Sequence, residues 1–244
     1  MRQAPVSHAI FRRPLLWLGL AAASAAPAAI NLGGSIASSS DYILRGVSQS
    51  DNHTVMQLDL HVQPSDSLSA GIWLSPVRPL PGRQSLELDV YGQWRLPLGN
   101  SASATLGANW YSYPNDPRSV SYNYAEYSAS VGWRDRVSVR VYYAPRVTLF
   151  SSLYRQTRSA STWSTELGLA QALPRRLTAT LGLGYYDAVG LQNAGYGYGN
   201  LTLGRDFGRM HAELSYVAVA SAAHRAYTPG AAGRPLNATV AWRF

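Results

Sequence analysis

Apolar and polar residues alternate with a period of two along most of the chain. Within residues 54–63, positions 56, 58, 60 and 62 hold Met, Leu, Leu and Val, while positions 57, 59, 61 and 63 hold Gln, Asp, His and Gln. Residues 85–96, 136–143 and 177–185 show the same alternation. This spacing is typical of β-strands, whose side chains point in turn to the two faces of a sheet, and not of amphipathic helices. The pattern therefore predicts an all-β fold.

The alternation divides the chain into twelve predicted strands. Turn-forming residues such as Pro, Gly, Asn, Asp and Ser separate many of them. The predicted strands are 34–45, 54–63, 68–76, 85–96, 102–113, 122–133, 136–146, 162–173, 177–186, 196–206, 210–219 and 235–244.

The connections between these strands alternate between tight turns and longer loops. The tight turns are 64–67, 97–100, 134–135, 174–176 and 207–209, and the longer loops are 46–53, 77–84, 114–121, 147–161, 187–195 and 220–234. An up-and-down antiparallel meander with a turn end and a loop end produces this alternation. A soluble sandwich or a lipocalin-like barrel would not need it, whereas barrels of the bacterial outer membrane have an even number of strands, short turns at one end and long loops at the other.

Aromatic residues gather at both ends of the predicted strands. The chain has 16 Tyr and 7 Trp but only 4 Phe, and Tyr and Trp favour membrane–water boundaries. Trp94, Trp133, Phe207 and Trp242 lie at the turn end. A second set lies at the loop end: Tyr42, Trp110, Tyr111, Tyr113, Tyr122, Tyr124, Tyr142, Tyr143, Trp163, Tyr185, Tyr186, Tyr196 and Tyr198. Two aromatic girdles around an apolar band predict a transmembrane up-and-down antiparallel β-barrel of about twelve strands.

The first residues have the composition of a secretory signal peptide. Residues 1–13 contain three Arg and no acid, an apolar run follows, and small residues occupy 23–28. The apolar run is short for a membrane-spanning helix, which is the alternative interpretation. We expect residues 1–28 to be a signal peptide and residues 29–244 to form the barrel.

Composition excludes several kinds of site. The chain has no Cys, so it has no disulfide, no thiolate metal site and no cysteine nucleophile. Only 14% of the residues are charged, and the formal net charge of +8 comes from dispersed Arg. The loop Arg residues attract anions at the barrel mouth or bind phosphates of outer-leaflet lipid and lipopolysaccharide, with the second slightly favoured. We expect no nucleic-acid partner, no cofactor and no metal.

Four segments carry a resemblance to a known family. They are S-D-Y-I-L-R-G-V-S-Q-S at 40–50, G-I-W-L-S at 71–75, E-L-D-V-Y-G at 87–92 and Y-A-E-Y at 124–127. The chain is similar here to the Gcw-type family of Gram-negative bacteria, also labelled TorF-type porins. The resemblance implies an outer-membrane barrel, and it implies a porin by label only, without a known solute.

The last residues are typical of an assembly signal. Val240, Trp242 and Phe244 share the apolar face of the final strand, and the chain ends at Phe244. Alternating apolar residues that close on a terminal Phe resemble the C-terminal signal of outer-membrane barrels. We therefore expect the outer-membrane assembly machinery to be a partner.

The polar faces of the strands set the possible chemistry. Both acids and bases are expected in the lumen, either lining a narrow passage for small polar solutes or pairing with one another to plug it. A non-conducting barrel whose loops bind a partner is the alternative function. The predicted lumenal residues are Asp41, Arg45, Asp59, His61, Glu87, Asp89, Arg95, Glu126, Arg140, Glu166, His211 and Glu213.

An enzymatic site is not indicated. His61 and His211 lie on the lumenal face, whereas a site that hydrolyses lipid should face the bilayer. His53 and His224 lie in loops, where histidines are usually solvated. We expect no catalytic residue.

Overall fold

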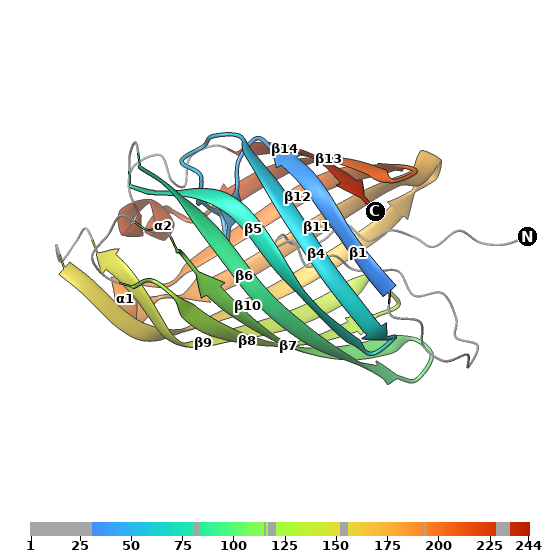
Figure 1. Ribbon diagram of the computed structural model, residues 1–244, viewed down its shortest axis with the longest axis horizontal. Helices are drawn as coiled ribbons and strands as arrows, with labels where there is room; N and C mark the ends of the chain where they lie inside the picture. Colours follow the sequence, from blue (N-terminus) through green and yellow to red (C-terminus); the bar gives the residue numbers. More distant parts are fainter. Residues whose placement is uncertain are drawn as a thin grey trace, which may run out of the picture.

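The computed structural model describes residues 31–80, 83–114, 116, 121–151, 156–192, 194–227 and 235–244. Within them the chain forms a closed barrel of twelve antiparallel strands, seen from the side in Figure 1. The predicted signal peptide, residues 1–28, lies outside the described residues. The predicted fold class and strand number are confirmed.

The barrel strands are long, and short helical elements lie between some of them. The strands are β1 (Asn31–Ser39), β4 (Val55–Ser65), β5 (Leu68–Leu80), β6 (Arg83–Leu98), β7 (Ala102–Ser112), β8 (Tyr124–Trp133), β9 (Val137–Ser151), β10 (Gln156–Leu173), β11 (Leu177–Asp187), β12 (Tyr196–Phe207), β13 (Met210–Val219) and β14 (Leu236–Arg243). The 3₁₀ turn η1 (Pro174–Arg176) joins β10 to β11, while the helices α1 (Val189–Gln192) and α2 (Ser221–Ala226) lie in loops.

Each strand pairs with its neighbour in the chain, and β1 closes the ring. β1 pairs with β14 on one side, from Ser35 opposite Arg243 to Ser39 opposite Thr239. On its other side β1 pairs with β4, because β2 (Ile43–Leu44) and β3 (Val47–Ser48) form a separate two-stranded sheet. No strand edge of the barrel is therefore left open, as a lipid environment requires.

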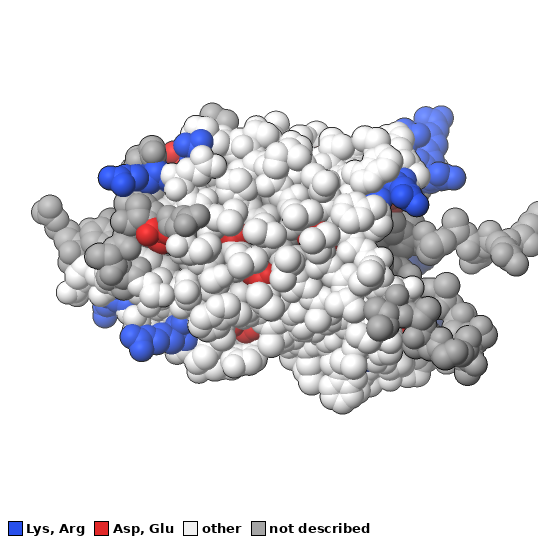
Figure 2. Space-filling model, in the orientation of Figure 1, with Lys and Arg blue, Asp and Glu red and all other residues white. Residues whose placement is uncertain are grey.

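The polarity of the barrel is the reverse of that of a soluble protein. Large apolar side chains such as Leu32, Met56 and Leu201 are exposed on the outside, whereas small polar side chains such as Ser35 and Thr239 are buried inside. Figure 2 shows Arg side chains gathered toward the two ends of the visible face, while the surface between them is mostly uncharged and shows a few acidic atoms. Such a surface suits contact with lipid. None of the described helices is long and apolar enough to cross a membrane.

One Arg lies on the outer face, as its parity predicts. Arg205 is exposed near the turn that follows β12, and its guanidinium lies 4.8 Å from the centre of the Phe207 ring. Near the interface a long side chain can keep its charge in water while its stem lies on apolar surface. Arg205 is therefore compatible with the outer face of a strand end.

The predicted girdles are confirmed at one end and corrected at the other. Trp94, Trp133, Phe207 and Trp242 all lie exposed at the turn end. At the loop end, Trp110, Trp163 and Tyr185 are exposed, but several of the predicted girdle residues are buried inside: Tyr42, Tyr111, Tyr122, Tyr142, Tyr186, Tyr196 and Tyr198. These rings fill the lumen and do not face lipid.

Two of the predicted long loops are largely strand. β5 continues to Leu80 and β6 begins at Arg83, where a loop over 77–84 was predicted. The predicted loop 147–161 is paired from Val147 opposite Ala160 onward, after a register shift. Thr, Val and Leu at these positions favour extended backbone, and pairing satisfies its hydrogen bonds.

Candidate functional site

A hairpin folds into the loop end of the barrel. The predicted strand 34–45 is wrong in its second half, because β1 stops at Ser39 and the next residues form β2 and β3. Arg45 and Gly46 make the two-residue turn between them, with φ of 51° and 79°. Two successive positive φ values are typical of a type I′ turn, and Gly adopts them without steric cost. We call residues 40–54 the lumen hairpin.

The base of the lumen hairpin is held by one carboxylate. The hydroxyls of Ser48 and Ser50 both donate to Oδ1 of Asp41, each at 2.6 Å. The backbone N–H of Tyr42 donates to Oγ of Ser50 at 3.0 Å, and the N–H of Gln49 donates to the carbonyl of Tyr42. The S-D-Y and S-Q-S parts of the motif therefore lie on the two sides of one hairpin, which explains their spacing.

The tip of the lumen hairpin ends in an ion pair. Nη2 of Arg45 donates to Oε2 of Glu126 on β8 at 2.8 Å, and both side chains are buried. The guanidinium carbon lies 5.1 Å from the ring centre of Tyr142 on β9 and 4.9 Å from that of Tyr186 on β11. We call Glu126, Tyr142 and Tyr186 the guanidinium site.

The sides of the lumen hairpin pack against opposite walls. Tyr42 donates to Oε1 of Glu87 at 3.0 Å and meets the Trp73 ring edge-on at 5.1 Å, on the β5–β6 wall. Val47 belongs to an apolar cluster with Tyr186 and Tyr198, on the β11–β12 wall. The hairpin therefore spans the lumen between these walls.

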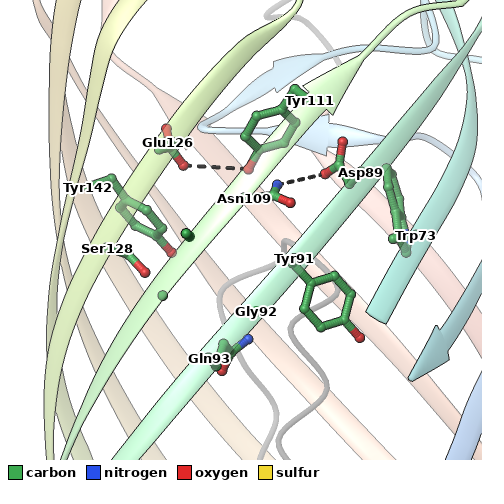
Figure 3. A pocket seen from close by; sticks show the side chains of 12 residues that line it. Trp73, Asp89, Tyr91, Gly92, Gln93, Asn109, Tyr111, Glu126, Ser128 and Tyr142 are labelled. Carbon is green, nitrogen blue, oxygen red and sulfur yellow. Dashed lines mark hydrogen bonds between the residues drawn. The ribbon is translucent and has the colours of Figure 1, made fainter. Parts of the chain in front are cut away.

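A small cavity adjoins the guanidinium site. Its volume is about 40 Å³, and its lining includes Asp89, Tyr91, Asn109, Tyr111 and Glu126, shown in Figure 3. Two hydrogen bonds order these walls, from Nδ2 of Asn109 to Asp89 at 3.0 Å and from the hydroxyl of Tyr111 to Glu126 at 3.5 Å. The space suits one or a few water molecules.

Carboxylates organise the other lumenal residues. Asp59 accepts hydrogen bonds from Nδ1 of His61 at 2.7 Å and from the hydroxyl of Tyr91 at 2.8 Å. Near the turn end, His211 contacts Asp206 at 2.8 Å through Nδ1 and Glu213 at 3.3 Å through Nε2. Both histidines thus bond to carboxylates, in arrangements that stabilise the wall.

A further group of lumenal side chains, around Glu166, joins β9, β10 and β12. Nη1 of Arg140 donates to the hydroxyl of Tyr142 at 3.2 Å, and Glu166 stands opposite Arg140 in the strand register. The hydroxyl of Tyr198 donates to Oε1 of Glu166 at 2.6 Å. Together these side chains line the wall next to the guanidinium site.

The predicted lumenal residues all lie inside, but not as one cluster. Asp41 and Arg45 belong to the lumen hairpin and not to a barrel strand. Glu126 pairs with Arg45, a partner that strand parity does not indicate. Sequence reasoning missed Asp206 and the lumenal tyrosines, although the even positions of β12 and the parity of each strand would have placed them inside.

Two tyrosines at the loop end lie outside the strands. Burial, together with nearby Glu87, raises the pKa of Tyr113 well above its ordinary value. Burial, together with Tyr196, does the same for the pKa of Tyr227. Both phenols are therefore neutral donors. Among the described residues, no group of three or more His, Asp and Glu side chains is placed to hold a metal ion.

Solved structures with a similar fold include membrane proteins. An outer membrane channel from Pseudomonas putida F1 aligns with a TM-score of 0.50 and 14% identity, covering 92% of this chain and all of that one (100%). A protein from a study of in-meso crystallization of membrane proteins aligns with the same TM-score of 0.50 and 10% identity, covering 87% and 83%. At these identities the likeness concerns the fold alone, which resembles barrels of the Gram-negative outer membrane.

Sequence comparison gives the family. No curated protein matches the chain. The profile of Gcw_chp, described as a bacterial protein of unknown function, matches residues 21–243. The chain therefore belongs to the Gcw_chp family.

Proposed function

We propose that this protein is a channel of the Gram-negative outer membrane through which small polar solutes diffuse passively. The observation that carries the proposal is the way in which the polar lumen is filled. A hairpin crosses the lumen, so the side chains of the barrel wall do not fill it by themselves. The lumen hairpin is joined to the wall by hydrogen bonds, ring contacts and the ion pair of Arg45 with Glu126. Such contacts can break and re-form while the barrel remains closed, so a passage can open without unfolding.

The width of the barrel supports a narrow passage. Eight-stranded barrels are filled by their own side chains, and barrels of about 16 to 18 strands hold a wide aqueous channel. A barrel of twelve strands lies between these limits. The lumen hairpin then sets the narrowest point, and its tip residue Arg45 controls what passes.

The excess of acidic side chains on the lumenal wall supports the passage of polar and cationic solutes over that of anions. The lumenal acids on the strands outnumber the lumenal arginines. The acids are Asp59, Glu87, Asp89, Glu126, Glu166, Asp206 and Glu213, and the arginines are Arg95, Arg140 and Arg243. An acidic lining favours cations in a pore.

The outer face and the ends fit the proposed partners. The apolar band suits membrane lipid, and arginines at the loop end, including Arg78, Arg83 and Arg158, suit the phosphates of lipopolysaccharide. The exposed Val240, Trp242 and Phe244 at the end of the last strand suit recognition by the outer-membrane assembly machinery.

A non-conducting barrel is the second candidate. It is favoured by the packing of the lumen hairpin against both walls, since a permanently seated hairpin would obstruct the lumen between them. In that case the loops would bind a partner and the interior would serve stability.

Liposome swelling distinguishes the two candidates. Refolded protein is reconstituted into liposomes that are diluted into isotonic solutions of solutes without net charge and of increasing size, such as glycine and arabinose. We expect swelling that falls steeply with solute size. Swelling no faster than in protein-free liposomes, for both the native chain and Arg45→Ala, would leave the non-conducting barrel as the function.

A further inference from the structure

We propose that the guanidinium site binds small solutes that carry a guanidinium group, and that Arg45 occupies this site as a tethered substitute. The inference deepens the proposed function by naming a solute class, and in that respect it rests on the proposed function. Binding to the site does not itself require conduction, so the two can be tested separately.

The chemistry of the site matches a planar delocalised cation. Glu126 supplies a buried carboxylate, 3% exposed, whose Oε2 accepts from Nη2 of Arg45 at 2.8 Å. A guanidinium presents its N–H donors in one plane to such a carboxylate and offers its faces to aromatic rings. Tyr142 and Tyr186 place their ring centres 5.1 and 4.9 Å from the guanidinium carbon, within the range of a cation–π interaction.

The wall alone builds this site. Glu126 lies on β8, Tyr142 on β9 and Tyr186 on β11, so all three stay in place when the lumen hairpin moves. Tyr111, which stacks on Tyr124 with ring centres 4.4 Å apart, directs its hydroxyl at Oε1 of the same carboxylate. Arg45 comes from the hairpin and occupies the site without being a part of it.

Further acids lie close to the site inside the lumen. The adjoining cavity is lined by Glu126 and Tyr142 at one side and by Asp89 and Tyr91 at the other. Asp59, which accepts the Tyr91 hydroxyl, lies beyond them. A cation that leaves the guanidinium site therefore meets further carboxylates within the lumen.

Arg45 and a free solute must compete for the site. A tethered group acts at an effective concentration of about millimolar, so a free guanidinium binds well only when Arg45 has withdrawn. A solute that binds the withdrawn state shifts the protein toward it. The solute would thus favour its own passage.

Calorimetric titration of folded protein in detergent tests the proposal. The probe is methylguanidinium chloride, and methylurea is the uncharged control of similar shape. The proteins are the native chain, Arg45→Ala and Arg45→Met, of which the last keeps the apolar stem of the side chain. We expect both variants to bind methylguanidinium at least about tenfold more tightly than the native chain, because the tethered competitor is gone. Methylurea should not bind.

Second-site variants locate the binding. Adding Glu126→Gln to Arg45→Met should weaken methylguanidinium binding by about tenfold or more, since a charge-assisted hydrogen bond is lost. Adding Tyr186→Leu should weaken it by roughly two- to fivefold. Glu213→Gln, which removes a lumenal carboxylate near the turn end, is the matched control and should have no effect. Heat-modifiability on gels verifies that each barrel is folded.

The outcomes separate the inference from the proposed function. Folded Arg45 variants that conduct ions but bind methylguanidinium no better than methylurea would overturn the guanidinium site and leave the channel. Binding that Glu126→Gln does not weaken would also overturn it. Binding with the expected pattern in a barrel that does not conduct would support the site and remove the channel.

Discussion

Nη2 of Arg45 lies 2.8 Å from Oε2 of Glu126, although the two residues are 81 positions apart in the chain. One belongs to the turn of the lumen hairpin and the other to the barrel wall. Both are buried, and breaking a buried ion pair by removing one partner leaves an uncompensated charge. This contact therefore holds the lumen hairpin in its seated position.

Gly46 is predicted to be required for that position. A Cβ atom there would lie 3.1 Å from Tyr198 Cβ and 3.2 Å from Val219 Cβ, and the backbone φ is +79°. Gly46→Val should therefore unseat the hairpin and expose Arg45 to trypsin. We expect cleavage after Arg45, identified by mass spectrometry, to be on the order of tenfold faster than in the native barrel, since left-handed backbone alone costs about 1–2 kcal/mol.

Gly99→Val is the matched control for this variant. Gly99 also has a positive φ, +71°, but nothing lies within 4 Å of a Cβ atom built there. The backbone strain is similar while the contact with the lumen hairpin is absent. Equal cleavage after Arg45 in the two variants would contradict the assigned role of Gly46.

The C-terminus is predicted to act in both closure and assembly. The N–H of Phe244 donates to the carbonyl of Gly34, and the N–H of Gly34 donates to the carbonyl of Phe244, both at 3.0 Å. Deleting Phe244 removes the two bonds and the exposed ring, whereas Phe244→Ala removes the ring alone. Both variants should insert poorly into the outer membrane of expressing cells, and the deletion should also lower stability by about 1 kcal/mol per bond. Normal insertion of Phe244→Ala would show that the ring is no assembly signal.

The alternation of apolar and polar residues predicted the barrel because a lipid-facing wall restricts which residue types each strand position can hold. Each strand must place apolar residues outside and polar residues inside, so Asp59, Glu87 and Glu213 could be assigned to the lumen from the sequence. The same rule applies to aromatic residues. The position of Tyr142 and Tyr186 near the strand ends predicts a girdle, whereas the even parity of each residue in its strand predicts the lumen, where both are buried.

The lumen hairpin could not be predicted from periodicity. Tyr42, Ile43 and Leu44 continue the apolar character of β1, so the pattern predicted one strand. Type I′ turns are usually signalled by Asn-Gly or Asp-Gly, whereas Arg45 precedes the Gly here. The ion pair with Glu126 depends on the closure of the whole barrel, which no local pattern contains.

Lumenal arginines are predicted to set ion selectivity. Arg140 stands opposite Glu166, and Arg95 lies on the lumenal face of β6. Replacing both with Gln should raise the permeability of K⁺ relative to Cl⁻ several-fold, because the wall loses two positive charges. Reversal potentials under a KCl gradient measure the change. Arg136→Gln in the exposed β8–β9 turn should leave selectivity unchanged, and an equal shift there would assign the effect to surface charge.

The turn end is predicted to face the periplasm. The chain has no Cys, so single substitutions can be labelled without background. Val189→Cys on α1, at the loop end, should react with an impermeant maleimide on intact cells, and Asn100→Cys in the β6–β7 turn should react only after lysis. Labelling of Asn100→Cys alone on intact cells would reverse the assigned orientation.

Single-channel conductance in planar bilayers tests the central claim most directly, with the refolded native chain and Arg45→Ala measured side by side. If a polar lumen is closed mainly by the lumen hairpin, the native protein should give small or brief openings, and Arg45→Ala should give openings several-fold larger or longer because the ion pair with Glu126 is lost. A folded Arg45→Ala barrel that inserts into the bilayer and stays electrically silent would contradict the account.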